Sequence, residues 1–178
     1  MGNRVGGAYS LTVVAPIVSG QEAAAREATE ALPAGTDSPL AQLGGLHFSR
    51  IHVVSELVFQ GPKQRHREEL RASHLIFTST FDGRDLDPYV EALRTDASPD
   101  TWWRYCVGYP GSSDAAAFAG WVREHQIDSS LFASAHPQAR VPHVLESLEL
   151  RERIIDFAID ARGLDARELQ QRFRETFA

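Results

Sequence analysis

The sequence predicts an α+β fold in which helices cover an antiparallel sheet. Three observations carry this prediction: short segments of alternating apolar residues, helical segments between and after them, and a composition ordinary for a globular protein. Hydrophobic residues make up 43% and charged residues 24% of the 178 residues. A chain of this size buries a sufficient core by itself, so we expect residues 1–178 to form a single domain.

Four segments have the composition of β-strands, being rich in apolar and hydroxyl residues and bounded by turn residues. They are residues 9–18, 46–57, 74–81 and 130–136. A helix is predicted over 21–32, between the first two strands, and Pro33-Ala34-Gly35 ends it. The stretch 60–72 is strongly polar and basic, and we expect it to be a mobile excursion between the second and third strands.

Helix start signals follow the third strand. Asp87-Pro88 and Ser98-Pro99-Asp100 each open a short helix, because proline is well suited to the first helical position. A third helical stretch is predicted over 113–126. Pro142 opens a long helix to about residue 161, and Asp165 with Glu168 forms a capping box for the last helix.

The predicted element order is strand, helix, strand, strand, helices, strand, helices. This order matches the ferredoxin-like βαββαβ plan, followed by a C-terminal helical extension over about residues 141–178. A sheet of this plan has helices on one face only, so its second face requires another cover.

The alternation within the strands predicts what that second face carries. Leu11, Val13 and Ala15 share the face that helices would cover, as do the apolar residues of the third strand. The other face mixes hydroxyls and histidine with apolar residues such as Val14, Ile76 and Phe132. This mixture suits a ligand cavity closed by a second copy of the chain, and predicts a homodimer. The alternative is an ordinary solvent-exposed face.

Three stretches in the middle of the chain resemble a known group of bacterial proteins. They are Ser38-Pro39-Leu40 with Leu46-His47-Phe48-Ser49-Arg50, then LIFTSTFDG over 75–83, then CVGYPG over 106–111. The wider resemblance is to the dimeric α+β barrels, a superfamily that includes dye-decolorising peroxidases, chlorite-dismutase-like proteins and small haem monooxygenases. The resemblance implies haem between sheet and helix, an axial histidine on the helix, and a distal Asp or Arg.

Under this resemblance the iron ligand would be His125, at the end of a predicted helix. His136, at the end of the fourth predicted strand, and His143, at the start of the long helix, are the alternatives. The Cys106 thiolate could also ligate haem, although a single cysteine near tryptophans is more often buried and inert.

Candidate catalytic residues lie on the second strand and at the end of the third. Arg50 and His52 share one side of their strand and His47 the other, and a guanidinium could hold a carboxylate or an iron-bound oxygen species. Asp82 would be the distal acid. A salt-bridged surface arginine and a turn-forming Asp82-Gly83 are the plain alternatives.

The composition and the missing motifs exclude several classes. A net charge of −6 argues against nucleic acid as a partner, and no apolar run is long enough to span a membrane. One cysteine and an N-terminus without an apolar segment predict a cytoplasmic location. All but one of the 18 basic residues are arginine, which is typical of GC-rich bacterial coding sequence. Zinc-hydrolase, serine-hydrolase and phosphate-loop motifs are absent.

Three functions follow from these features. The first is a haem-dependent oxidoreductase, peroxidase- or monooxygenase-like, that acts on a small organic molecule. The second is a cofactor-free enzyme of the same fold, acid–base or oxygenase in type, with histidine and arginine in the cavity. The third is a non-catalytic protein for small-molecule binding or assembly.

Overall fold

The computed structural model describes residues 2–59, 61–66 and 68–177. The chain divides into two compact units, Met1–Gln138 and Ala139–Ala178, where the sequence predicts one domain with an extension from about residue 141. The first unit contains the sheet and four helices, and the second contains two helices. Each unit is described by itself.

The first unit is built on an antiparallel sheet with the strand order β1-β2-β4-β3. The strands are β1 (Arg4–Val5), β2 (Ala8–Pro16), β3 (Leu46–Val54) and β4 (His74–Asp82). The long strands β2, β3 and β4 confirm the first three predicted strands. Strand β4 lies between the other two and pairs with each of them in antiparallel register.

The fourth predicted strand, over residues 130–136, is wrong: these residues form no strand. The outer edge of β2 is instead closed by short pieces of chain. Ile127 N donates to Thr12 O, Val14 N donates to His125 O, and Val107 N donates to Pro16 O. With these backbone groups satisfied, the edge needs no continuous fourth strand.

Residues 128–137 run along the N-terminal turn instead. The amide of Asn3 donates to Asp128 Oδ1 at 2.7 Å and accepts from Ser129 N at 2.7 Å. Gly7 N donates to Pro137 O at 2.8 Å. Leu131, which the predicted strand would have buried, is 85% exposed. The alternation of residues 130–136 therefore does not correspond to a buried face.

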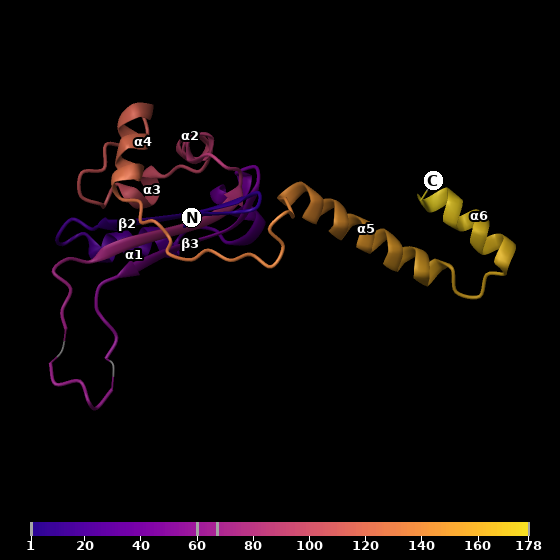
Figure 1. Ribbon diagram of the computed structural model, residues 1–178, viewed down its shortest axis with the longest axis horizontal. Coiled ribbons are helices and arrows are strands. Elements are labelled where there is room, and N and C mark those ends of the chain that lie inside the picture. The colour runs from indigo at the N-terminus through magenta and orange to yellow at the C-terminus, as the bar shows by residue number, and fades with distance from the viewer. Residues whose placement is uncertain (1, 60, 67, 178) are drawn as a thin grey trace. The chain divides into compact units, whose positions relative to one another are not determined.

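Helices cover one face of this sheet. They are α1 (Glu22–Glu30), α2 (Leu86–Asp96), α3 (Asp100–Trp103) and α4 (Ala115–Glu124), with short 3₁₀ turns η1 (Gly35–Asp37) and η2 (Pro39–Gln42). Helices α2, α3 and α4 lie together on one side of the sheet (Figure 1). The predicted helices over 21–32 and 113–126 and those opened near Pro88 and Pro99 are confirmed within a few residues.

The core lies between these helices and the sheet, on the face that strand alternation predicts. Leu11, Val13 and Phe77 are fully buried, and Trp102 and Trp103 of α3 are fully buried against them. The rings of Phe77 and Trp103 lie 5.4 Å apart, centre to centre. Aromatic rings thus fill much of the space between the sheet and its helices.

The connection between β3 and β4 has no helix or strand in its described residues 55–59, 61–66 and 68–73. It extends away from the sheet (Figure 1). Residues 60 and 67, which belong to the predicted mobile excursion 60–72, lie outside the described residues.

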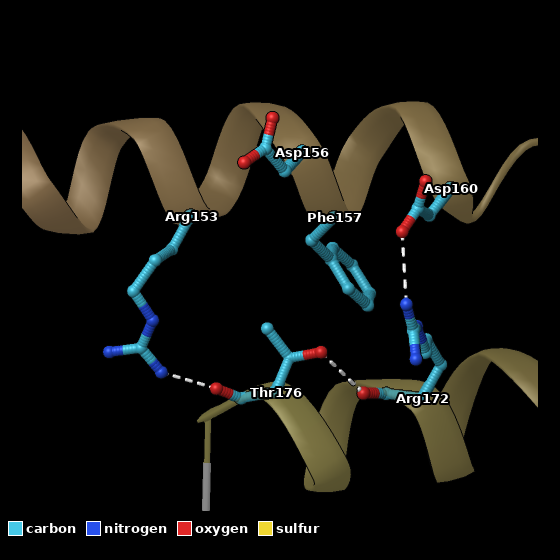
Figure 2. A pocket seen from close by; sticks show the side chains of 6 residues that line it. All are labelled: Arg153, Asp156, Phe157, Asp160, Arg172 and Thr176. Carbon is cyan, nitrogen blue, oxygen red and sulfur yellow. Dashed lines mark hydrogen bonds and ion pairs between the residues drawn. The ribbon is translucent and has the colours of Figure 1, made fainter.

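The second unit is a helical hairpin of α5 (Val141–Asp160) and α6 (Ala166–Phe177). The predicted capping box is confirmed: Asp165 Oδ1 accepts from Glu168 N at 2.9 Å, and Glu168 Oε2 accepts from Asp165 N at 3.1 Å. Phe157 of α5 contacts Phe173 and Phe177 of α6. Figure 2 shows Arg172 reaching from α6 to Asp160, at 2.9 Å.

Within the described residues no helix is both long and apolar enough to cross a membrane.

Candidate active site

The structure brings together two of the predicted catalytic residues, His47 and Asp82. Nε2 of His47 lies 3.0 Å from Oδ1 of Asp82, and the two side chains are 23% and 15% exposed. His47 is the second residue of β3, and Asp82 is the last residue of β4. The pair therefore lies at one end of the sheet.

A β-bulge makes this contact. Leu46 pairs with Phe81 and Phe48 pairs with Thr80, so β3 holds one extra residue, His47, between two successive pairs. A bulge leaves its extra residue unpaired and turns its side chain out of the regular alternation. His47 is thereby directed to Asp82, while Leu46 stays on the core side and packs against it.

Gly45 packs closely against Asp82. Its carbonyl accepts from Asp82 N at 2.8 Å, and its φ of +80° is one that side-chain-bearing residues rarely adopt. A Cβ at Gly45 would lie 3.1 Å from Asp82 Cβ. Glycine thus permits the close approach that fixes the position of Asp82.

The His47–Asp82 pair has a defined chemistry. In a hydrogen bond between an imidazole nitrogen and a carboxylate oxygen the nitrogen donates, so Nε2 is the donor to Asp82 Oδ1 and Nδ1 is the nitrogen left to accept a proton. An imidazole oriented by a carboxylate in this way acts as a general base through its other nitrogen. Paired histidine and aspartate can equally be a structural ion pair, and the experiment proposed below separates the two.

The open face of the sheet continues from this pair in regular rows. Thr80 lies between Ser10 and Phe48, and in the next row Thr78 lies between Thr12 and Arg50. A third row consists of Val14, Ile76 and His52. Val14, Ile76 and Thr78 are half-buried, whereas Phe48, Arg50 and His52 on the edge strand are exposed. The face mixes hydroxyls and apolar groups, as the strand alternation predicts.

Arg50 is the cation on this face nearest in the strand to the histidine–aspartate pair. Its guanidinium lies 5.6 Å from the centre of the Phe48 ring, which supports it from one side. Two residues of strand span about 7 Å, so Arg50 lies roughly that far along the sheet from the row of Phe48. His52 lies a further row away.

His125, the first predicted iron ligand, lies at the end of α4 on the far edge of the sheet from β3. Its backbone carbonyl accepts from Val14 N, on the outer edge of β2. Its ring lies 4.4 Å from the ring of Trp121, which packs in the core, and Nδ1 is 2.9 Å from Trp121 O. Nδ1 therefore carries the proton and Nε2 is free to bind a metal.

His125 and Arg50 do not face one shared space. They lie at opposite edges of the sheet, and His125 packs on the helical side whereas Arg50 projects from the open face. An iron on His125 would therefore not be faced by Arg50 or Asp82 of the same chain. The axial and distal groups that the resemblance implies are not assembled by these residues.

The remaining predicted ligands lie apart from both histidines. Cys106 is buried beside Ile17, and burial raises the pKa of its thiol to about 12, so it stays protonated and inert near neutral pH. His136 is exposed in the segment after α4, and His143 is exposed near the start of α5. The described part of the chain contains no cluster of three or more His, Cys, Asp or Glu side chains that could hold a metal ion.

One functional feature could not be found from the sequence: the contact of His47 with Asp82. The strand alternation places His47 opposite Arg50, but the partner of His47 depends on the bulge and on the β3–β4 register. The long connection between these strands leaves that register open, so only the structure reveals the contact.

No family model, no curated protein and no solved structure matches the chain.

Proposed function

We propose that the protein is a cofactor-free acid–base enzyme that acts on a small organic anion at the open face of its sheet. The observation that carries this proposal is the 3.0 Å contact between His47 Nε2 and Asp82 Oδ1. His47 Nδ1 would take a proton from the substrate or from a water, and Asp82 would hold the imidazole and stabilise its charged form.

Arg50 indicates the class of substrate, an organic anion. A guanidinium binds a carboxylate through two parallel hydrogen bonds, and the hydroxyls of Thr78 and Ser10 lie on the same face. His47 and Arg50 are three residues apart in β3, which is about 10 Å of strand, so a substrate whose carboxylate is bound by Arg50 would need its reacting proton about that far away to reach His47. The proposed substrate class is therefore a small carboxylic acid.

The order β2-β4-β3 supports a ferredoxin-like plan as part of this proposal, and with it a distant kinship to the dimeric α+β barrels. In that plan a fourth strand would lie beside β2, where Gln126 forms a single bridge with Val13. A homodimer in a bacterial cytoplasm is part of the same proposal.

The test uses p-nitrophenyl acetate, an activated ester that an oriented imidazole hydrolyses. His47→Gln should lower the hydrolysis rate of the purified protein by about 100-fold, the usual contribution of a general base. Asp82→Asn should lower it too, because the imidazole loses its orientation. His52→Gln is the matched control, a histidine on the same strand without the carboxylate contact, and should leave the rate unchanged.

Equal rates for wild type and His47→Gln would contradict the proposal. A different result would be that neither the wild type nor the two variants hydrolyse the ester, although both variants still bind a small molecule as the wild type does. The protein would then be the non-catalytic binding or assembly protein that the sequence also allows.

A haem-dependent oxidoreductase is the second candidate, and one observation favours it. The hydrogen bond from His125 Nδ1 to Trp121 O orients the imidazole in the way that a backbone carbonyl orients a metal-binding histidine. This candidate requires distal groups other than Arg50 and Asp82. Hemin titration decides it: a saturable absorption band that His125→Ala abolishes would favour haem, and its absence would remove the candidate.

A further inference from the structure

Helix α5 is apolar on two opposite sides, and α6 covers only one of them. Arg153, Phe157 and Asp160 point toward α6, as Figure 2 shows. Residues follow one another by about 100° around an α-helix, so Leu148 and Ile155 lie on the opposite side of α5.

The uncovered side of α5 carries an apolar stripe in two parts. We call this the α5 stripe; its members are Val144, Leu145, Leu148, Ile155 and Ile159. Each of them is exposed, from 39% for Ile155 to 60% for Leu145. No described residue of α5 or α6 is buried. A two-helix hairpin without a core is marginal in water, because helices are stabilised mainly by packing an apolar face.

Arg151 and Glu152 interrupt the stripe at its middle. Neither side chain has a hydrogen-bond or ion-pair partner within the residues that the structure describes. They flank the line from Leu148 to Ile155 on its two sides, at the same height on the helix. A surface that presents an acid to one flank and a base to the other would therefore complement this stripe.

A second copy of α5 presents these charges when the two helices run parallel. A two-fold axis along the helices places Leu148 against its equivalent and Ile155 against its equivalent. One side of the stripe carries Val144 and Arg151, and the other side carries Leu145 and Glu152. The same axis places the first side of one helix against the second side of the other helix. Arg151 then meets the second copy's Glu152 twice, once on each side of the axis. In an antiparallel pair like flanks meet, so arginine would face arginine.

We propose that the α5 stripe is the surface through which two copies of this chain associate, in parallel, with two symmetric Arg151–Glu152 ion pairs at the middle. This surface lies in the second unit, in α5. It is independent of the acid–base chemistry assigned to His47 and Asp82.

The test is a charge exchange in the full-length chain, read by sedimentation at micromolar concentration. Arg151→Glu alone and Glu152→Arg alone each replace both attractive pairs with repulsive ones, and should weaken dimerisation about ten-fold or more. A mixture of the two variants restores attraction on both flanks and should give a mixed dimer. Arg174→Glu on α6 is the control; it changes the net charge as Arg151→Glu does and should leave the dimer intact.

Orientation is tested by Leu148→Cys. In a parallel pair residue 148 faces itself, so mild oxidation should cross-link the full-length variant into a covalent dimer. A wild-type monomer, single variants that dimerise as wild type does, or a mixture that stays monomeric would each overturn the proposal. A wild-type monomer would point to another protein as the cover of the stripe, and single variants that dimerise as wild type does would point to a dimer formed through another surface.

Discussion

The two units of this chain reach stability by different means. In the first, Leu11, Phe77 and Trp103 are fully buried between sheet and helices. In the second, no described residue of α5 or α6 is buried, and contact between the helices rests on a few rings and ion pairs. Similar shares of apolar residues thus give a closed core in one unit and exposed stripes in the other. Apolar content alone does not fold a segment; it needs a facing surface.

The largest effect is expected for Trp103→Ala in the core of the first unit. The ring of Trp103 lies 5.3 Å from that of Trp121 and 5.7 Å from that of Phe118, so its removal leaves a large cavity. Such truncations cost about 3–5 kcal/mol of the free energy of unfolding. Urea unfolding followed by tryptophan fluorescence measures it, and a loss below about 1 kcal/mol would mean that the core is far looser than described.

Gly6→Ala should have the next largest effect. A Cβ at Gly6, whose φ is +58°, would lie 2.0 Å from Pro137 O, so the segment that closes the N-terminal turn must shift. We expect a loss of about 2 kcal/mol, from backbone strain and the clash together. Gly20→Ala is the matched control, because Gly20 has a φ of +85° but open space around it. Equal thermal shifts for the two variants would contradict the close approach.

Asp100 should make the first unit sensitive to acid. Burial disfavours its ionised form, but hydrogen bonds from Ser112 and Tyr109 outweigh burial and hold the pKa of Asp100 below its usual value. The contribution is therefore present above about pH 4, where the unfolded side chain ionises, and is lost as pH falls through the lowered folded pKa.

Asp100→Asn should accordingly cost about 1 kcal/mol at neutral pH, and its difference from wild type should shrink below about pH 4. Urea unfolding at a series of pH values measures this. A difference that stays constant down to pH 3 would show that the carboxylate charge has no part in it.

The smallest global effect is expected for Phe173→Ala in the hairpin. Phe173 contacts Phe157 across the hairpin but is itself 54% exposed. The variant should lose helicity by circular dichroism, while the free energy of unfolding of the sheet unit changes by about 0.5 kcal/mol or less. A shift as large as that of Trp103→Ala would mean that the two units unfold together.

The sequence predicts elements well where a strong local pattern coincides with burial. The faces of β2 and β4 and the capping box of α6 are all confirmed, because alternation and capping chemistry are local properties. The strand predicted over 130–136 fails because its alternation is made largely of alanine and serine, and the β2 edge is satisfied by other backbone groups.

The candidate site likewise has a part that the sequence predicts and a part that it does not. His47, Arg50 and Asp82 can be chosen from residue type and strand position, but the contact of His47 with Asp82 depends on a bulge and on a long-range register. Those are properties of strand pairing between distant residues, which no local pattern encodes. The separation of His125 from Arg50 likewise depends on where α4 and β3 lie, at opposite edges of the sheet, which no local pattern predicts.

The most direct test of this contrast between the units is amide hydrogen exchange of the full-length protein at a series of protein concentrations. If α5 gains its facing surface from a second copy, protection of the amides of residues 145–157 should rise with concentration. Protection of the β4 amides should stay constant, because the core of the first unit is complete in one chain. Protection of α5 that is the same at every concentration would contradict the account.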